Sequence, residues 1–209
     1  MSAPSTVAKR LETIGRGVLR LVVHDERIDH QSNGYAVIEN GVITVIDPLP
    51  VVPGLLERHG RIGAIVIACP SHQRAAFGLR TASGAAIHAP AESHGLQGEA
   101  DHLFRDGDRL PGGLVAVHAP GPSGPHYALR LERPPGFLFV ADLLLNDSRS
   151  GIRFLEAPHL PDPAAARRSV LLLLGLPFER LAFGHGDPIL EGGREAMRAV
   201  LGAEGGVSG

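Results

Sequence analysis

Three short segments of the chain place side chains that bind metals or transfer protons directly after apolar strands. Cys69 and His72 follow one such strand, Asp142 follows a second and His185 follows a third. Imidazole and carboxylate groups are zinc ligands, and imidazole is the most common general base in proteins. These residue types can bind a metal ion or transfer a proton, and we take Asp142 and His185 as the candidate catalytic residues.

Each of these residues also has a structural interpretation. Asp142 is either a metal or substrate contact or a strand-end carboxylate that caps backbone amides. His185 is a ligand, a general base, or a histidine held in a tight Gly184-His185-Gly186 turn. Cys69 offers a soft ligand or a nucleophile. No motif for cysteine catalysis surrounds it, so we predict a buried packing role.

Further candidates lie beside these positions, and we take His72, Arg74, His126 and Asp187 as possible substrate contacts. We predict that His72 is exposed at the start of a helix; the alternative is a shift of the turn that brings it inward. His126 follows a Gly/Pro loop, from which it could enter a cleft. Asp187 either orients His185 or makes a turn before a proline.

The elements that must position these residues are read from periodicity and turn signals. Asn40-Gly41 is a strong type I′ hairpin signal, and Asp162-Pro163 is typical of a helix start. The segment after Asp142 is expected to be irregular. The expected strands are 18–23, 35–39, 42–46, 64–68, 86–88, 114–118, 127–132, 137–140 and 181–183, and the expected helices are 52–59, 74–83, 163–174 and 192–201.

Composition narrows the class of protein. The 209 residues suit a single domain, with about 1–12 and 203–209 as flexible ends. A formal net charge of −2 provides no basic excess for nucleic acid, and the longest apolar runs are too short to span a membrane. A lone cysteine excludes an intrachain disulfide. We expect a cytoplasmic protein that binds a small molecule in its cleft. A homodimer is an alternative that the sequence leaves undecided.

Four local patterns in order resemble the metallo-β-lactamase superfamily over almost the whole chain. They are Ser32-Asn33-Gly34-Tyr35 leading to Asp47-Pro48, strand 65–68 running into Cys69-Pro70-Ser71-His72-Gln73-Arg74, the Pro120-Gly121-Pro122 loop followed by Asp142, and Gly184-His185-Gly186. The resemblance implies an α+β fold, a four-layered αββα sandwich. It also implies a cleft that holds one or two zinc or iron ions for hydrolysis.

The sequence departs from the motifs of that family at most metal-binding positions. Where the family has Thr-His-x-His-x-Asp-His, this chain has Ala68-Cys69-Pro70-Ser71-His72-Gln73-Arg74, and Pro122 replaces the histidine of the Pro-Gly-His-Thr loop. Only Asp142 and His185 match, whereas catalytic zinc generally has three protein ligands. We therefore expect no cofactor, and we hypothesise that Arg74 pairs with Asp142 in place of a metal.

Three functions remain open. The first is a hydrolase-like protein that lacks the standard dinuclear site and binds a small molecule without turnover. The second is an active hydrolase of an ester, lactone or thioester. Its site would be either metal-free or an altered single-metal site, with one zinc or iron held by Cys69, His72, Asp142 and His185. The third is a non-enzymatic interaction protein. Fold alone does not separate them, because function depends on the site.

Overall fold

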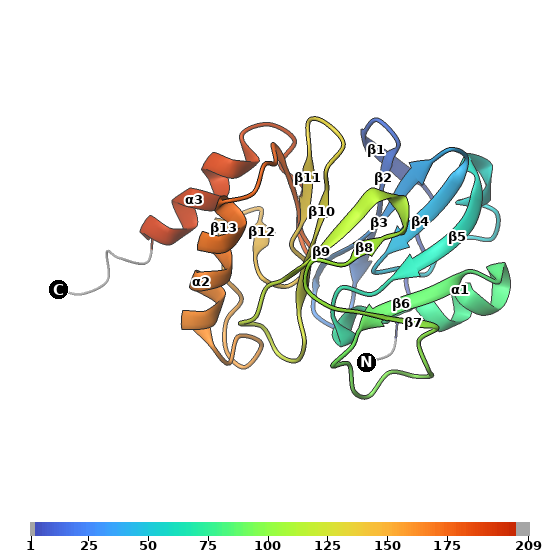
Figure 1. The fold of residues 1–209 in the computed structure, drawn as a ribbon, viewed down its shortest axis with the longest axis horizontal. Helices are drawn as coiled ribbons and strands as arrows, with labels where there is room; N and C mark the ends of the chain where they lie inside the picture. Colours follow the sequence, from blue (N-terminus) through green and yellow to red (C-terminus); the bar gives the residue numbers. More distant parts are fainter. Residues whose placement is uncertain (1–2, 204–209) are drawn as a thin grey trace.

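The strands of the protein form two sheets, as seen in a computed structural model that describes residues 3–203 (Figure 1). The larger sheet has seven strands in sequence order, β1 (Leu11–Gly15), β2 (Val18–Asp25), β3 (His30–Glu39), β4 (Val42–Ile46), β5 (Arg61–Val66), β6 (Ala86–Pro90) and β7 (His102–Phe104). The smaller sheet has the order β14 (Arg180–Ala182), β11 (Phe137–Phe139), β10 (Tyr127–Leu131), β9 (Leu114–His118) and β8 (Arg109–Leu110).

Helices cover the outer face of each sheet (Figure 1). Helix α1 (Ala76–Ser83) packs on the larger sheet, while α2 (Pro163–Leu174) and α3 (Gly193–Ala203) pack on the smaller one. Between the sheets, buried side chains such as Val66, Leu129 and Phe139 form a central core. The expected four-layered αββα sandwich is confirmed.

Local signals in the sequence account for several boundaries. Asn40 and Gly41 have φ of +50° and +75° and join β3 to β4, as a type I′ hairpin requires. Asp162 accepts a hydrogen bond from the Ala165 amide at 2.8 Å, so it caps α2 as predicted. Gly84 ends α1 in the left-handed conformation.

Other expectations about the elements are wrong. The segment 52–59 is not an α-helix, because Gly54 has a φ of +78°, outside the helical region; only Glu57–His59 forms a 3-10 turn. The segment after Asp142 is not irregular throughout, since β12 (Leu145–Asp147) and β13 (Gly151–Arg153) form a hairpin.

The expected flexible N-terminus contains ordered contacts. Ala8 is buried and bridges Val51, and β1 begins at Leu11. Residues 204–209 of the expected flexible C-terminus lie outside the described residues. No helix in the described part of the chain is long and apolar enough to cross a membrane.

Candidate functional site

Two neighbouring parallel strands bring Asp142 and His185 to one edge of the smaller sheet. Phe139 of β11 pairs with Ala182 of β14, and Asp142 and His185 each lie three residues beyond these partners. The carboxyl ends of parallel strands meet at the same edge, so the two side chains arrive together. Their closest polar atoms, Asp142 Oδ1 and His185 Nε2, are 3.3 Å apart.

The segment after β5 supplies Cys69 and His72 from the larger sheet. Pro70–His72 forms a single 3-10 turn (η2) that is separate from α1, which begins only at Ala76. This turn leaves His72 2% exposed and places its Nε2 3.0 Å from Asp142 Oδ1. The prediction of an exposed His72 is therefore wrong, and the inward alternative describes the structure.

Both histidine rings are oriented through Nδ1. His72 Nδ1 lies 2.9 Å from Asp47 Oδ2, and the other oxygen of Asp47 accepts the Ala68 amide at 2.8 Å. His185 Nδ1 lies 2.9 Å from the Gln31 carbonyl oxygen. A carboxylate and a carbonyl only accept, so Nδ1 is the donor in each ring. In the neutral form, each Nε2 then presents a lone pair toward Asp142.

When His72 is neutral, the atoms that face each other are both acceptors. Nε2 of His72 and Oδ1 of Asp142 are buried 3.0 Å apart, and in that protonation state they have no hydrogen-bond donor within the described residues. Buried polar atoms without partners are rare in proteins and often mark a bound ion or water. Converging lone pairs of this kind require a cation, either protons or a metal ion.

Cys69 completes a group of three potential ligands. The ligand atoms of Cys69, His72 and Asp142 all lie within 4.8 Å of one another. Burial raises the pKa of the Cys69 thiol, and Sγ lies 3.1 Å from Ser71 Oγ. The predicted burial of Cys69 is confirmed, at 1% exposure. A thiolate forms at this position when a cation offsets the cost of burial.

The pKa shifts in the cluster show the same demand for positive charge. Burial and Arg74 act to lower the pKa of His72, but Asp142, Cys69 and Asp47 outweigh them and hold it well above its ordinary value. Burial acts to raise the pKa of Asp142, but His72 and His185 hold it well below its usual range. The cluster thus stabilises a carboxylate and attracts a cation.

Packing behind the cluster fixes Asp142. His126 is fully buried, and burial lowers its pKa to about 4. Its neutral ring accepts the Asp142 amide at Nε2 (3.1 Å), while Nδ1 lies 2.9 Å from the Ala119 carbonyl. Both ring nitrogens are used, so His126 supports Asp142 from behind and does not enter the cleft as a substrate contact.

A cleft with a volume of about 380 Å³ opens over the cluster. Ser71, His72, Asp142 and His185 form its polar floor. Its walls combine apolar and charged side chains, namely Ile28, Leu145, Leu155, Pro158, His30, Arg153, Glu156 and His159. The cleft can therefore hold a small molecule against Asp142 and His185.

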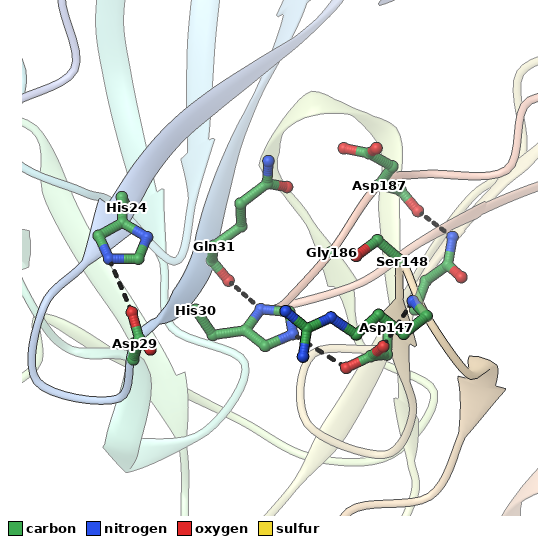
Figure 2. Close-up of a pocket in the computed structure, with 10 residues that line it drawn as sticks. His24, Asp29, His30, Gln31, Asp147, Ser148, Gly186 and Asp187 are labelled. Carbon is green, nitrogen blue, oxygen red and sulfur yellow. Dashed lines mark hydrogen bonds and ion pairs between the residues drawn. The ribbon is translucent and has the colours of Figure 1, made fainter.

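A second, polar pocket is shown in Figure 2, and His30 lines both this pocket and the cleft. Gln31 lines this pocket, and its carbonyl oxygen lies near Nδ1 of both His30 (3.3 Å) and His185 (2.9 Å). The outer acidic groups are engaged there: Asp29 pairs with His24, and Asp147 with His30. Gln31, whose carbonyl orients His185, therefore lies in the wall of this pocket.

Solved structures share this arrangement of elements. The metallo-β-lactamase DIM-1 exposed to ceftazidime matches with a TM-score of 0.75 and 13% identity, over 96% of this chain and 100% of that chain. The metallo-β-lactamase FIM-1 from Pseudomonas aeruginosa, in its mono-zinc form, matches with a TM-score of 0.76 and 16% identity, over 98% and 99%. The archaeal metallo-β-lactamase superfamily protein ST1585 from Sulfolobus tokodaii matches with a TM-score of 0.74 and 14% identity, over 93% of this chain and 88% of that chain. No family model and no curated protein matches the sequence. The chain has the metallo-β-lactamase fold.

Within this metallo-β-lactamase fold, Arg74 does not pair with Asp142, contrary to our hypothesis. Arg74 Nη1 donates to the Asn33 carbonyl at 2.7 Å, while the ion-pair partners of Asp142 are His72 and His185. The inward turn of His72 explains the difference, because its ring lies against the carboxylate.

Gln73 and Asp187 also lie away from the cluster. Gln73 bonds to the Gly95 carbonyl and the Gln97 amide, which holds a loop beside α1. Asp187 forms an ion pair with Arg20 at 2.9 Å, its side chain is 70% exposed, and the acceptor that orients His185 is the Gln31 carbonyl. Neither residue therefore lies where a ligand would contact the cluster.

No sequence pattern indicates a role for Gln31, because its backbone carbonyl is the functional group. Asn33, by contrast, lies in a predicted motif. Its side-chain amide donates to the Phe183 and Gly186 carbonyls, and its backbone amide donates to the Gly184 carbonyl. Asn33 thereby fixes the segment that carries His185.

Proposed function

We propose that the protein is a hydrolase with a single metal ion held by Cys69, His72 and Asp142, and that His185 is its general base. The observation that carries the proposal is the pair of buried atoms His72 Nε2 and Asp142 Oδ1, which face each other at 3.0 Å and are both acceptors when His72 is neutral. One thiolate, one imidazole and one carboxylate form a ligand set that suits zinc.

The surroundings of His72 support the assignment. Metal-binding histidines usually donate their second ring nitrogen to a carboxylate or carbonyl, which fixes the tautomer that leaves the ligating nitrogen unprotonated. Asp47 provides that acceptor for His72 at 2.9 Å. Zinc held there would supply Lewis acidity at the floor of the cleft.

His185 occupies the side of the cluster that faces the cleft. Its side chain is 15% exposed, and the Gln31 carbonyl keeps the proton on Nδ1. Nε2 can therefore accept a proton from a water that attacks the carbonyl carbon of an ester, lactone or thioester. The same proton then passes to the departing alcohol or thiol, so water and substrate give an acid and the leaving group.

A metal analysis of the purified protein tests the proposal. We expect about one zinc ion per wild-type chain, and a marked loss of zinc in Cys69→Ser and Asp142→Asn. In cobalt-substituted protein, Cys69→Ser should also abolish the thiolate-to-cobalt charge-transfer absorption. His24→Ala, which removes an exposed histidine that pairs with Asp29, is the matched control and should retain the metal. Wild-type protein that binds no stoichiometric metal would overturn the proposal.

A further inference from the structure

Arg74 is a buried cation that lacks an acidic partner. The residue is 5% exposed, and no ion pair involves it within residues 3–203. The hydrogen bond that Arg74 forms joins Nη1 to the carbonyl oxygen of Asn33 at 2.7 Å. A buried charge is costly unless it is paired, so a guanidinium in this state is suited to an anionic ligand.

The guanidinium is held rigidly at the cleft. Arg74 has a φ of +31°, in a region that side chains other than glycine rarely adopt. Its carbonyl partner, Asn33, is itself fixed by the bonds from its side chain to the Phe183 and Gly186 carbonyls. Little conformational freedom remains to be lost when a ligand binds.

The geometry of the bond to Asn33 leaves one edge of the guanidinium available. Nη1 is occupied, whereas Nε and Nη2 have no acceptor among the described residues and are not sealed from solvent. Arg74 lines the cleft together with His72, Asp142 and His185. Two parallel N–H groups match the two oxygens of a carboxylate or of a phosphate group.

The start of helix α1 adds positive potential beside Arg74. Helix α1 starts two residues later, and its first turn has neither an acidic residue nor a side-chain cap. The amino-terminal end of a helix carries partial positive charge, which adds to that of the guanidinium. Beside the charged Arg153 and Glu156, the walls of the cleft contain apolar side chains, namely Ile28, Leu145, Leu155 and Pro158.

From these observations we infer that Arg74 binds an anionic oxygen group of the substrate, and that the substrate class is a short apolar ester, lactone or thioester that carries a carboxylate or phosphate. The inference rests on the proposed function for the identity of the reacting group. The anion contact itself requires neither turnover nor a metal ion.

Binding of two simple anions tests this contact. Succinate and inorganic phosphate are each titrated calorimetrically into the full-length protein as purified, and again after treatment with a chelator. We expect wild type to bind at least one anion, Arg74→Gln to bind it at least about 10-fold more weakly, and Arg74→Lys to be intermediate. Preference for succinate assigns a carboxylate, and preference for phosphate assigns a phosphate ester.

Arg133→Gln is the matched control, because Arg133 also donates Nη1 to a carbonyl, that of Ile38, but does not line the cleft. It should leave anion binding unchanged. The inference is overturned if wild type binds neither anion, or if Arg74→Gln and Arg74→Lys bind as tightly as wild type. Should Arg74→Gln not fold, the wild-type and Arg74→Lys titrations still decide. Failure of hydrolysis or of metal binding would leave these titrations interpretable, so the two proposals fail separately.

Discussion

His72 Nε2 and Asp142 Oδ1 lie 3.0 Å apart and come from segments that follow strands of different sheets. The contact joins the segment after β5 to the segment after β11, so it forms only when the two sheets have packed together. Because each residue is oriented by other bonds, the pair is preorganised to hold a cation between its two atoms, either a proton or a metal ion.

Replacing Asp47 with asparagine should weaken metal binding through the tautomer of His72. The carbonyl oxygen of the new side chain can still accept the Ala68 amide, but its NH₂ group would then face His72 Nδ1. His72 would have to accept at Nδ1 and carry its proton on Nε2, the proposed ligand atom. We expect zinc affinity to fall about 10- to 100-fold, as measured by competition with a chromophoric chelator.

Asp101→Asn is the control for this substitution. Asp101 also accepts a backbone amide, that of Ile87 in β6, but it does not line the cleft. Its substitution should leave zinc affinity unchanged. Equal zinc affinity of Asp47→Asn and wild type would remove Asp47 from the metal site.

Replacing His185 with alanine should separate proton transfer from metal binding. The three proposed ligands stay in place, so the metal content should equal that of wild type. We expect kcat for ester or lactone hydrolysis to fall about 100-fold or more, because the general base is lost. Loss of the metal in His185→Ala would instead make His185 a ligand, and unchanged turnover would exclude it from the mechanism.

The layers of the fold can be predicted from sequence because their signals are local. Asn40-Gly41 adopts positive φ at both positions, and Asp162 caps a helix that begins with proline. The segment 52–59 is the exception, since its apolar pattern suits a helix, whereas Gly54 adopts a φ of +78° that interrupts the helical conformation. Periodicity alone does not overrule such breakers.

The site can be predicted only in part, because its geometry depends on contacts between distant segments. Asp142 and His185 lie at recognisable strand ends, and they do meet. The sequence pattern continues α1 back to Arg74 and so predicts an exposed His72, whereas the tight turn η2 points the ring inward. No local pattern indicates that a backbone carbonyl at Gln31 orients His185.

Gly184 is expected to be irreplaceable, because the proposed metal site lies directly against its backbone. A Cβ at this position would lie 2.7 Å from His72 Cε1 and 3.1 Å from Asp142 Oδ1. Gly184→Ala should therefore push the two proposed ligands apart, lowering metal content and destabilising the protein by about 1–3 kcal/mol. Metal analysis and thermal unfolding measure the two effects.

Gly78→Ala provides the contrasting variant. Gly78 lies within α1, and an added Cβ would have no atom within 4 Å. This substitution should raise the free energy of unfolding by up to about 1 kcal/mol, since alanine favours the helix, and should leave metal content unchanged. Equal metal content in Gly184→Ala and Gly78→Ala would contradict the proposed position of the ion.

The pH dependence of stability should include a contribution from Asp25, away from the cluster. The hydrogen bond from the Arg27 side chain is the main cause that lowers the pKa of Asp25 from 3.8 to about 2, against the effect of burial. A lowered pKa in the folded state means that the stabilisation is present above the unfolded-state pKa and is lost as pH falls through about 2. Asp25→Asn should therefore cost about 1–2 kcal/mol at pH 7, after allowance for the partial exposure of Arg27, and only a small part of that cost should remain at about pH 2. Urea unfolding of wild type and Asp25→Asn between about pH 2 and pH 7 measures the difference.

Asp29→Asn is the control, because Asp29 is an exposed carboxylate, and its stability should show no such dependence on pH. A destabilisation that is equal at both ends of the range would show that the cost comes from packing and not from the charge of Asp25.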